Sequence, residues 1–326
     1  MARALVVGGG VSGLLHALAL RAAGVSIEGV VDPNLPQAEL LTSLVGGIAT
    51  SSFEIAREWE VDVAAICSPP SVHVAQAIAL ARRGRLVFVE KPVALGEHDL
   101  GRLRELPSVV PIVQWRAGRS ARMLRALFAA EAFGPAPRLS IDLRAWRDDA
   151  YFMGGRRGLA QWGCGAMTSI GIHAVDLALH AVGRKVVSWQ GREVFGRPAV
   201  DVPTGGSLTI GFEGGAVAVV SITLDAPGCN DLVLAARGPS GSALLAASEG
   251  DPTAAPLELR GEARRIARQL PDPGGAGGSP LLVPFVKEAL DAHRRGESSI
   301  RVDDVAEAHT LVLGLAASTE IVERAG

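Results

Sequence analysis

One lysine is placed where a proton-transfer group would be useful. Lys91 lies in Glu90-Lys91-Pro92, directly after an apolar run, and the chain has only three lysines among its 32 basic residues. At the carboxyl end of a parallel strand, where such sheets bind ligands, a lysine can exchange a proton with a hydroxyl group or polarise its oxygen. Burial or a neighbouring cation would lower its pKa from about 10.4 toward the range that a base needs. The alternative, an ordinary surface lysine at a strand end, is the lesser interpretation.

A glycine pattern near the N-terminus predicts a dinucleotide site. Gly8-Gly9-Gly10-Val11-Ser12-Gly13 follows the apolar strand Ala4-Leu5-Val6-Val7 and opens a helix. In a G-x-G-x-x-G turn of this kind the backbone approaches a pyrophosphate, and the helix N-terminus faces the phosphates. Asp32 ends the next strand, where its carboxylate can bind both ribose hydroxyls and would repel a 2′-phosphate. The sequence therefore predicts NAD rather than NADP, bound by Gly8, Gly10, Val11, Ser12, Gly13 and Asp32. A chance match in a chain with 39 glycines is the alternative, which the strand, helix and acidic residue disfavour.

A second titratable candidate, His173, lies in an expected helix of the second half of the chain. Ser169 stands four residues before it and Asp176 three residues after it. A single histidine among apolar helix residues is more often a structural core residue than a catalyst. Asp176 is expected to act as a structural hydrogen-bond acceptor on the same helix.

Four segments together resemble the glucose–fructose oxidoreductase and inositol dehydrogenase (Gfo/Idh/MocA) family over essentially the whole chain. They are the glycine turn, Cys67-Ser68-Pro69-Pro70-Ser71-Val72-His73, Glu90-Lys91-Pro92, and the stretch from Gly163 to Asp176. The segment Trp146-Arg147-Asp148-Asp149-Ala150-Tyr151-Phe152 is similar to the family's sequence before the last of these motifs.

The resemblance implies a nicotinamide-dependent oxidation or reduction of a sugar, cyclitol or nucleotide-sugar carbon. Lys91 would be the active-site lysine and His173 the active-site histidine. Ser68, Pro69 and His73, with Glu90 and Lys91, would line the cofactor site near the nicotinamide. The substrate would contact Lys91, Ser169, His173, Trp146 and Arg147. Many family members are dimers or tetramers, so a homodimer or homotetramer is expected.

Ser169 departs from the family pattern, which has aspartate or asparagine at this position. A serine hydroxyl can orient a substrate oxygen but does not act as a base at neutral pH, so Lys91 and His173 would carry the proton transfer. Two alternatives therefore stay open. One is the reduction of a C=N bond or an unusual ketone in a biosynthetic pathway, and the other is a non-catalytic NAD-bound sensor. Retention of Lys91 and His173 argues against the sensor, which needs neither.

Four arginines, Arg144, Arg147, Arg156 and Arg157, cluster in sequence near the expected substrate site. A guanidinium group suits a phosphate or carboxylate on a substrate. Arginine replaces lysine almost throughout this chain, however, so solvated surface charges are the slightly favoured interpretation.

The elements that must position these residues fall into two predicted α/β domains. Residues 1–118 alternate strand and helix patterns, which predicts a Rossmann domain with a parallel sheet. The connections 213–215 and 238–241 are short, which favours antiparallel hairpins within residues 119–326. The family resemblance implies that residues 119–326 form a substrate-binding and oligomerisation domain with an open, mostly antiparallel sheet. The predicted strands are 4–7, 27–31, 63–67, 86–89, 109–113, 139–146, 186–195, 207–212, 216–224, 232–237 and 243–247. The predicted helices are 11–23, 72–83, 97–106, 119–131, 167–181, 281–295 and 303–324.

Composition excludes several other classes of protein. Apolar residues make up 48% of the 326 residues, charged residues 20%, and the net charge is −2. These values exclude intrinsic disorder and give no overall field for nucleic acid or an anionic membrane. Cys67, Cys164 and Cys229 lack the spacing of metal ligands, so neither a metal site nor a disulfide is expected. No uninterrupted apolar stretch is long enough to span a bilayer, and we expect a cytoplasmic protein with a small-molecule substrate.

Overall fold

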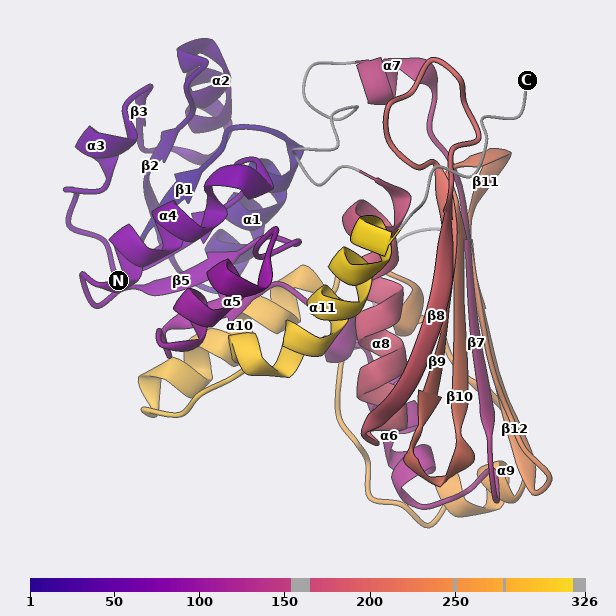
Figure 1. Ribbon diagram of the computed structural model, residues 1–326. Helices are drawn as coiled ribbons and strands as arrows, with labels where there is room; N and C mark the ends of the chain where they lie inside the picture. Colours follow the sequence, from indigo (N-terminus) through magenta and orange to yellow (C-terminus); the bar gives the residue numbers. More distant parts are fainter. Residues whose placement is uncertain (154–164, 249–250, 278–279, 319–326) are drawn as a thin grey trace. The chain divides into compact units, whose positions relative to one another are not determined.

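The computed structural model describes residues 1–153, 165–248, 251–277 and 280–318, which form two compact units (Figure 1). The first unit comprises Met1–Ile112 and Leu282–His309, and the second comprises Val113–Leu281 and Thr310–Gly326. The predicted boundary at residue 118 lies close to the start of the second unit. The segment Leu282–His309, which the sequence assigned to the second domain, groups with the first unit.

The first unit is built on a parallel sheet of six strands in the order β3-β2-β1-β4-β5-β6. β4 and β5 are buried throughout, as expected for strands covered on both faces. The order reverses beside β1, which pairs with β2 on one side and β4 on the other. In such sheets this reversal opens a crevice at the carboxyl ends of the strands. The strands are β1 (Arg3–Val7), β2 (Ser26–Val31), β3 (Ile48–Thr50), β4 (Val63–Ile66), β5 (Leu86–Val89) and β6 (Val109–Pro111).

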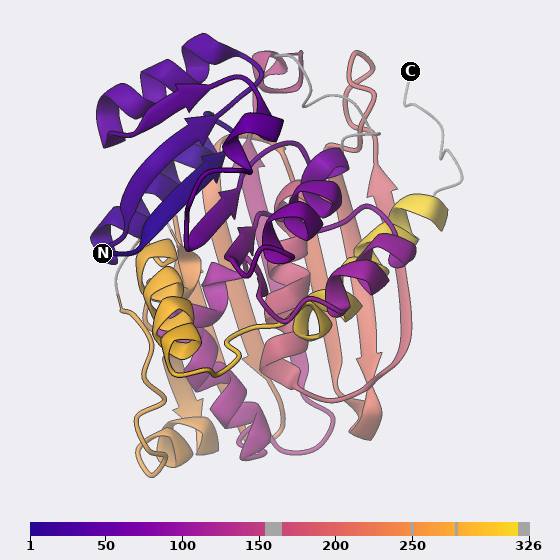
Figure 2. The same ribbon diagram turned by 90° about the vertical axis from the view of Figure 1, so that its left-hand side faces the viewer.

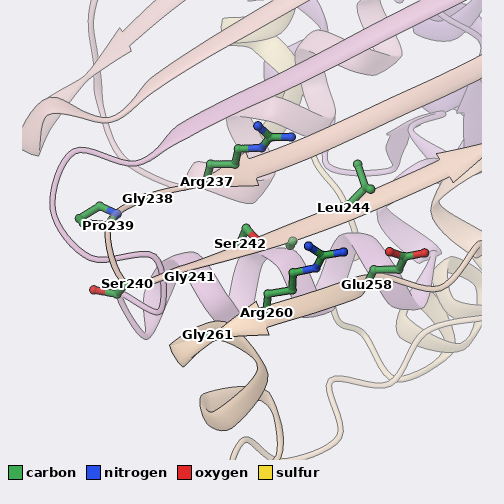
Figure 3. A pocket seen from close by; sticks show the side chains of 11 residues that line it. Arg237, Gly238, Pro239, Ser240, Gly241, Ser242, Leu244, Glu258, Arg260 and Gly261 are labelled. Atoms are coloured by element: carbon green, nitrogen blue, oxygen red, sulfur yellow. The ribbon is translucent and has the colours of Figure 1, made fainter.

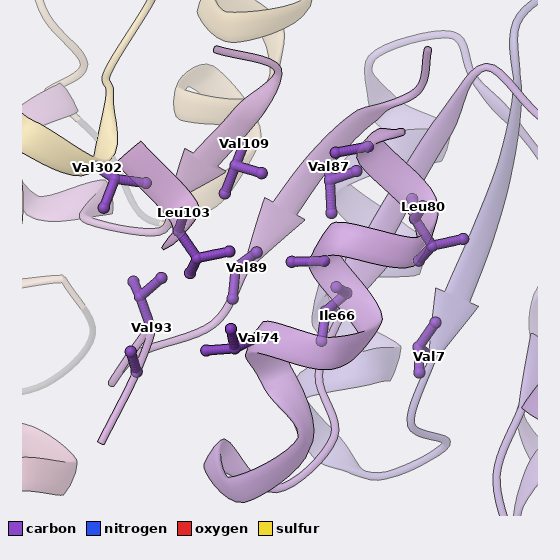
Figure 4. Close-up of a cluster of buried hydrophobic side chains, with 14 of the residues drawn as sticks. Val7, Ile66, Val74, Leu80, Val87, Val89, Val93, Leu103, Val109 and Val302 are labelled. Carbon is purple, nitrogen blue, oxygen red and sulfur yellow. The ribbon is translucent and has the colours of Figure 1, made fainter. Parts of the chain in front are cut away.

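Helices cover this sheet and complete its core. Ile66, Val87 and Val89 of the strands pack with Leu103 and Val302 of the helices (Figure 4). The helices are α1 (Val11–Ala22), α2 (Leu35–Val45), α3 (Phe53–Ala56), α4 (Pro70–Ala81), α5 (Glu97–Arg104), α10 (Leu282–Arg294) and the part of α11 (Val302–Ser318) that ends at His309. α10 packs against α1, which explains why this late segment belongs to the first unit. The sequence prediction did not include α2, β3 and α3.

The second unit contains a mixed sheet of seven strands in the order β13-β12-β11-β7-β10-β9-β8. β7 and β10 are parallel, and the other neighbouring pairs are antiparallel. Both predicted hairpins, β9–β10 and β11–β12, are confirmed. The strands are β7 (Arg138–Trp146), β8 (Val186–Val194), β9 (Gly205–Phe212), β10 (Val217–Thr223), β11 (Asp225–Arg237), β12 (Gly241–Ala247) and β13 (Glu258–Gly261).

Helices cover one face of this sheet, and within the described residues the other face has exposed side chains. α6 (Arg119–Ala129) and α8 (Ile172–Val182) pack together, and α8 contacts β7 and β10 (Figures 1 and 2). Along β10 the side chains of Ala218, Val220 and Ile222 are buried, whereas Val219 between them is 39% exposed. This alternation is the period of a strand with one covered face. The predicted α/β fold class, a parallel Rossmann sheet plus a mostly antiparallel open sheet, is confirmed.

Short helical segments complete the second unit. They are η1 (Gln114–Ala117), α7 (Asp149–Met153), η3 (Met167–Gly171), η4 (Glu213–Gly215), η5 (Pro252–Ala254) and α9 (Glu262–Ala267). The predicted helix 167–181 corresponds to the π-helical η3 followed directly by α8. β13 and α9 were not predicted. Among the helices of the described ranges, none has the length and apolar character that a membrane crossing requires.

Candidate functional site

The glycine turn after β1 has the geometry that the sequence predicted for it. Gly8 has φ +103°, and a Cβ atom there would lie 2.6 Å from the carbonyl oxygen of Cys67. A Cβ atom at Gly13 would lie 2.0 Å from the carbonyl oxygen of Gly8. Among the described residues, no atom beyond the chain neighbours of Gly10 lies within 4 Å of its Cβ position, and no side chain caps α1 where it begins at Val11. Two glycines are thus required by close packing, and the third leaves space beside a helix N-terminus that suits a phosphate group.

Asp32 is fixed beside this turn, at the end of β2. Its Oδ2 accepts a hydrogen bond from the backbone N–H of Gly9 at 2.9 Å, and its Oδ1 accepts one from Asn34 N–H at 2.9 Å. Each carboxylate oxygen can accept more than one hydrogen bond, so both retain capacity for a hydroxyl group. These residues fit the pyrophosphate and ribose of a dinucleotide.

The residues that follow β4 and β5 lie at the same carboxyl edge of the parallel sheet as the glycine turn and Asp32. Glu90 Oε2 accepts the backbone N–H of Lys91 at 3.1 Å, and Glu90 Oε1 lies 3.0 Å from Nε2 of His16. His16, in α1, is 0% exposed and was not recognised from the sequence. Burial lowers the pKa of His16, but Cys67 and Glu90 outweigh it and raise the pKa above its usual value. Burial raises the pKa of the Cys67 thiol, and the Glu90 carboxylate lies within hydrogen-bond distance of the His16 ring.

His73 joins the two turns that follow β4 and β5. Its Nε2 lies 2.7 Å from the carbonyl oxygen of Ser68, and its Nδ1 lies 2.9 Å from that of Pro92. Burial lowers the pKa of His73, so the neutral ring donates to one carbonyl at a time. Pro69 is extended and directly precedes α4. His73 therefore supports the predicted cofactor residues through the backbone.

All of the residues predicted to bind the cofactor lie at the carboxyl ends of β1, β2, β4 and β5 or in the helices that follow, within the first unit. They are Gly8, Gly10, Val11, Ser12, Gly13, Asp32, Ser68, Pro69, His73, Glu90 and Lys91. The structure thus brings together residues that are spread over 84 positions of the sequence.

The predicted substrate residues Ser169 and His173 lie on neighbouring turns in the second unit. Ser169 belongs to the π-helical η3, a rare geometry that is frequent at functional sites. His173 lies in the first turn of α8 and stacks on Trp115, with ring centres 5.1 Å apart and planes at 29°. The ring is therefore held in a defined orientation by a residue that the sequence did not single out.

Asp176 has the structural role that was predicted for it. Its Oδ2 accepts from Nε of Arg116 at 2.9 Å, and its Oδ1 accepts from Nη2 of the same guanidinium at 2.5 Å. The side chain of Asp176 is buried and that of Arg116 is 12% exposed, and such a bidentate ion pair has a fixed geometry. Since Arg116 follows Trp115 directly, η1 holds α8 at two positions.

The segment after β7 carries the remaining predicted substrate residues, Trp146 and Arg147. The guanidinium of Arg147 donates to the carbonyl oxygen of Trp146 at 2.8 Å and lies 5.5 Å from the ring centre of Tyr151. Arg144 forms an exposed ion pair with Asp231 at 2.7 Å, which agrees with a surface role for it. Arg156, Arg157, Gly163 and Cys164 lie outside the described residues.

Arg197 anchors this segment, although sequence analysis gave it no role. Its guanidinium lies 4.5 Å from the ring centre of Trp146, and its Nη1 donates to Asp149 Oδ1 at 2.9 Å. Its Nε donates to Asp225 Oδ1 at 2.6 Å, at the start of β11. The side chain of Arg197 is only 13% exposed. It therefore ties the residues after β7 to the rest of the sheet.

We expect Arg197→Met to lower the free energy of unfolding by about 1–3 kcal/mol, because a charge-assisted hydrogen bond and a cation–π contact are lost. Urea unfolding followed by circular dichroism measures this change. The matched control is Arg144→Met, which removes an exposed ion pair with Asp231 and should change the free energy of unfolding much less, because solvent screens such pairs. Equal losses for the two variants would contradict an anchoring role for Arg197.

A hollow of about 620 Å³ lies elsewhere in the second unit (Figure 3). The hairpin from Arg237 to Leu244 lines it together with Glu258, Arg260 and Gly261. None of the predicted cofactor or substrate residues lines this hollow, so it is not the candidate active site.

A Rossmann unit with a glycine turn, joined to a unit with an open mixed sheet, defines a two-domain dinucleotide-binding protein. Comparison with family models matches residues 2–109 to the Gfo/Idh/MocA oxidoreductase family with an NAD-binding Rossmann fold. Residues 121–244 match the Gfo/Idh/MocA C-terminal domain. The chain therefore belongs to the Gfo/Idh/MocA oxidoreductase family.

Solved structures share this fold over the whole chain. WlbA dehydrogenase from Bordetella pertussis, in complex with NADH and UDP-GlcNAcA, has a TM-score of 0.83 at 19% identity, over 97% of this chain and 95% of that one. Levoglucosan dehydrogenase with NADH and levoglucosan has a TM-score of 0.79 at 18% identity, over 97% and 96%. A myo-inositol dehydrogenase from Corynebacterium glutamicum has a TM-score of 0.73 at 21% identity, over 98% and 97%. A comparison with curated proteins found no match.

Proposed function

We propose that this protein is an NAD-dependent oxidoreductase that transfers a hydride to or from a hydroxyl- or ketone-bearing carbon of a sugar-like substrate. The observation that carries the proposal is the position of Lys91. It follows β5 at the same sheet edge as the glycine turn and Asp32, and its backbone is bonded to Glu90. A titratable amine near a dinucleotide-binding turn can exchange a hydroxyl proton with the substrate during hydride transfer.

The cofactor-binding residues have separate tasks in this proposal. Bound NAD supplies the hydride acceptor. The open space at Gly10 and the amides at the start of α1 bind its pyrophosphate, and Asp32 binds the adenosine ribose. The negative charge of Asp32 disfavours the 2′-phosphate of NADP.

The residues predicted to contact the substrate have different roles in this proposal. Lys91 exchanges the hydroxyl proton or polarises the oxygen, and His173 is the second titratable group. Ser169 orients a substrate oxygen, because a hydroxyl donates and accepts hydrogen bonds without titrating near pH 7. Trp146 and Arg147 contribute substrate contacts from the segment that Arg197 anchors.

The ligands of the related structures support a sugar-like substrate class. UDP-GlcNAcA is bound in the WlbA dehydrogenase structure, and levoglucosan is bound in levoglucosan dehydrogenase. The third relative is named for myo-inositol, a cyclitol. Sugars, nucleotide sugars and cyclitols are therefore the compounds to test first.

An absorbance assay at the NADH band tests the proposed reaction. Keto sugars, cyclitols, nucleotide sugars and cyclic imines are each supplied with NADH, and the corresponding alcohols and amines with NAD. Turnover of a hydroxyl or ketone substrate supports the proposal, whereas turnover of imines alone supports a C=N reductase. Tight NADH binding without turnover on any compound would favour the non-catalytic sensor.

We expect Ser169→Ala to lower turnover by about tenfold or less, because one neutral hydrogen bond contributes about 0.5–1.5 kcal/mol. The comparison variant is His173→Ala, which removes a titratable group and should lower turnover much more. Steady-state rates with the same substrate measure both effects. A loss at Ser169→Ala as large as that at His173→Ala would show that the serine does more than orient the substrate.

We also propose that two or four copies of the chain associate through the uncovered face of the seven-stranded sheet. Val217, Val219 and Ala235 line a shallow apolar hollow of about 360 Å³ on the central strands, bordered by Arg138 and Arg237. Exposed apolar patches of this kind are typical of protein interfaces. Light scattering of the protein and of Val219→Lys tests the proposal, since a monomeric parent protein would exclude it.

A further inference from the structure

The backbone amide of Val93 is held by a side chain that is distant in sequence. Val93 is 0% exposed, and its N–H donates to Nε2 of His309 at 2.9 Å, across 216 positions of the chain. A buried amide needs an acceptor. Because Pro92 has no N–H, the first backbone N–H after Lys91 that can donate a hydrogen bond is that of Val93. The contact therefore acts on the backbone two residues beyond the candidate catalytic lysine.

The hydrogen bonds of His309 define its tautomer. Nδ1 lies 2.9 Å from the carbonyl oxygen of Val305, one turn earlier in α11. A carbonyl only accepts, so Nδ1 carries the proton, while Nε2 accepts from Val93 and carries none. The ring is 2% exposed. A buried imidazole with both nitrogens engaged has a fixed position.

Two other buried histidines support the same segment, one by contact with its backbone and one through the Glu90 side chain. His73 from α4 faces the carbonyl oxygen of Pro92, so the two polar groups of the peptide unit between Pro92 and Val93 each meet an imidazole. His16 from α1 contacts Glu90, which accepts the N–H of Lys91. The backbone on both sides of the lysine is thus held by side chains from three helices.

We propose that His309 is a positioning residue for Lys91. It holds the amide of Val93 and thereby fixes the backbone from which the lysine side chain projects. The proposal rests on the proposed function only in taking Lys91 as the group that exchanges the proton. Misplacement of a reacting group by about 1 Å can lower the rate about a hundredfold. A backbone hydrogen bond two residues from Lys91 is therefore close enough to affect the reaction rate.

The test compares two replacements of His309. His309→Leu replaces the ring with an apolar side chain and removes the acceptor for Val93, whereas His309→Gln restores an acceptor oxygen near the position of Nε2. The matched control is His293→Leu, the same change at an exposed position of α10 in the same unit. Circular dichroism and thermal unfolding confirm which variants are folded.

The first measurement needs no substrate. The chain has three lysines, so amine labelling followed by peptide mass spectrometry gives separate rates for Lys91, Lys185 and Lys287. In His309→Leu we expect the rate at Lys91 to change by about three- to tenfold, the effect of losing one buried hydrogen bond, while the two exposed lysines stay unchanged. His309→Gln and His293→Leu should both resemble the parent protein.

The second measurement is kinetic and uses any substrate that the absorbance assay identifies. We expect His309→Leu to lower kcat by about ten- to a hundredfold, with NADH affinity within about threefold of the parent protein. His309→Gln should recover most of the lost kcat. A role in stability alone would lower the unfolding temperature and leave kcat of the folded protein unchanged.

These outcomes separate the two proposals. If no compound is turned over, the proposed function fails, and the labelling rates still decide whether His309 positions Lys91. Unchanged labelling at Lys91 in folded His309→Leu would overturn the positioning role. If that variant does not fold, hydrogen exchange on the parent protein decides, since a Val93 amide that exchanges as fast as an unprotected amide is incompatible with the contact.

Discussion

Replacing Lys91 by methionine is expected to lower turnover by about two to four orders of magnitude, the usual span for a general acid–base group. Methionine keeps an unbranched side chain at the end of β5 and removes the amine. NADH affinity should stay near that of the parent protein, because the glycine turn and Asp32 do not depend on the lysine side chain. Steady-state turnover and NADH titration by protein fluorescence measure the two quantities.

The chain offers a matched control for this substitution. Lys287 is exposed on α10 of the same unit, so Lys287→Met makes the same chemical change at a distant surface. It should leave both turnover and NADH affinity unchanged. Wild-type turnover by Lys91→Met would refute the role assigned to Glu90-Lys91-Pro92, whereas loss of NADH binding would mean that the lysine supports the cofactor instead.

The parts of the fold that could be predicted are those with a strong local pattern. β4 and β5 are short apolar runs ended by proline turns, and both were recognised at nearly their observed bounds. α2 was missed because it exposes Leu40 and Leu44, so its apolar residues do not mark one face. β3 has three residues, too few to show a period.

Strand pairing between distant segments could not be read from sequence. β7 pairs with β10 in parallel, and β10 also pairs with β9 in an antiparallel hairpin. The short connection 213–215 predicts the hairpin, because loop length limits its geometry. No local feature specifies a partner about 80 residues away, so the mixed character of the sheet emerges only in the structure.

The candidate site shows the same division between local and distant information. Gly8, Gly13 and Asp32 belong to a motif whose spacing encodes its geometry, so their arrangement was predictable. His16 and His309 contact Glu90 and Val93 across 74 and 216 positions. Each resembles an ordinary core histidine in its own helix, and only its distant partner reveals what it holds.

Cofactor preference is the second large effect that we expect. We expect the Kd for NADPH to be about a hundredfold higher than the Kd for NADH, because a 2′-phosphate would face the Asp32 carboxylate. This ratio corresponds to about 3 kcal/mol of binding free energy. The carboxylate is held in place by the amides of Gly9 and Asn34, so it cannot easily turn away. Fluorescence titration with both cofactors at one salt concentration measures the ratio of the two Kd values.

Asp32→Asn removes the charge and keeps an acceptor oxygen for one of the two amides. The ratio of NADPH to NADH Kd should then fall by about tenfold or more, mainly through tighter NADPH binding, because a like-charge repulsion has been removed. Asp99→Asn, at the exposed start of α5, makes the same change away from the glycine turn and should leave the ratio unchanged. If the parent protein bound NADPH as tightly as NADH, the 2′-hydroxyl would not lie against Asp32, and the ribose assignment would be wrong even though the glycine turn is correct.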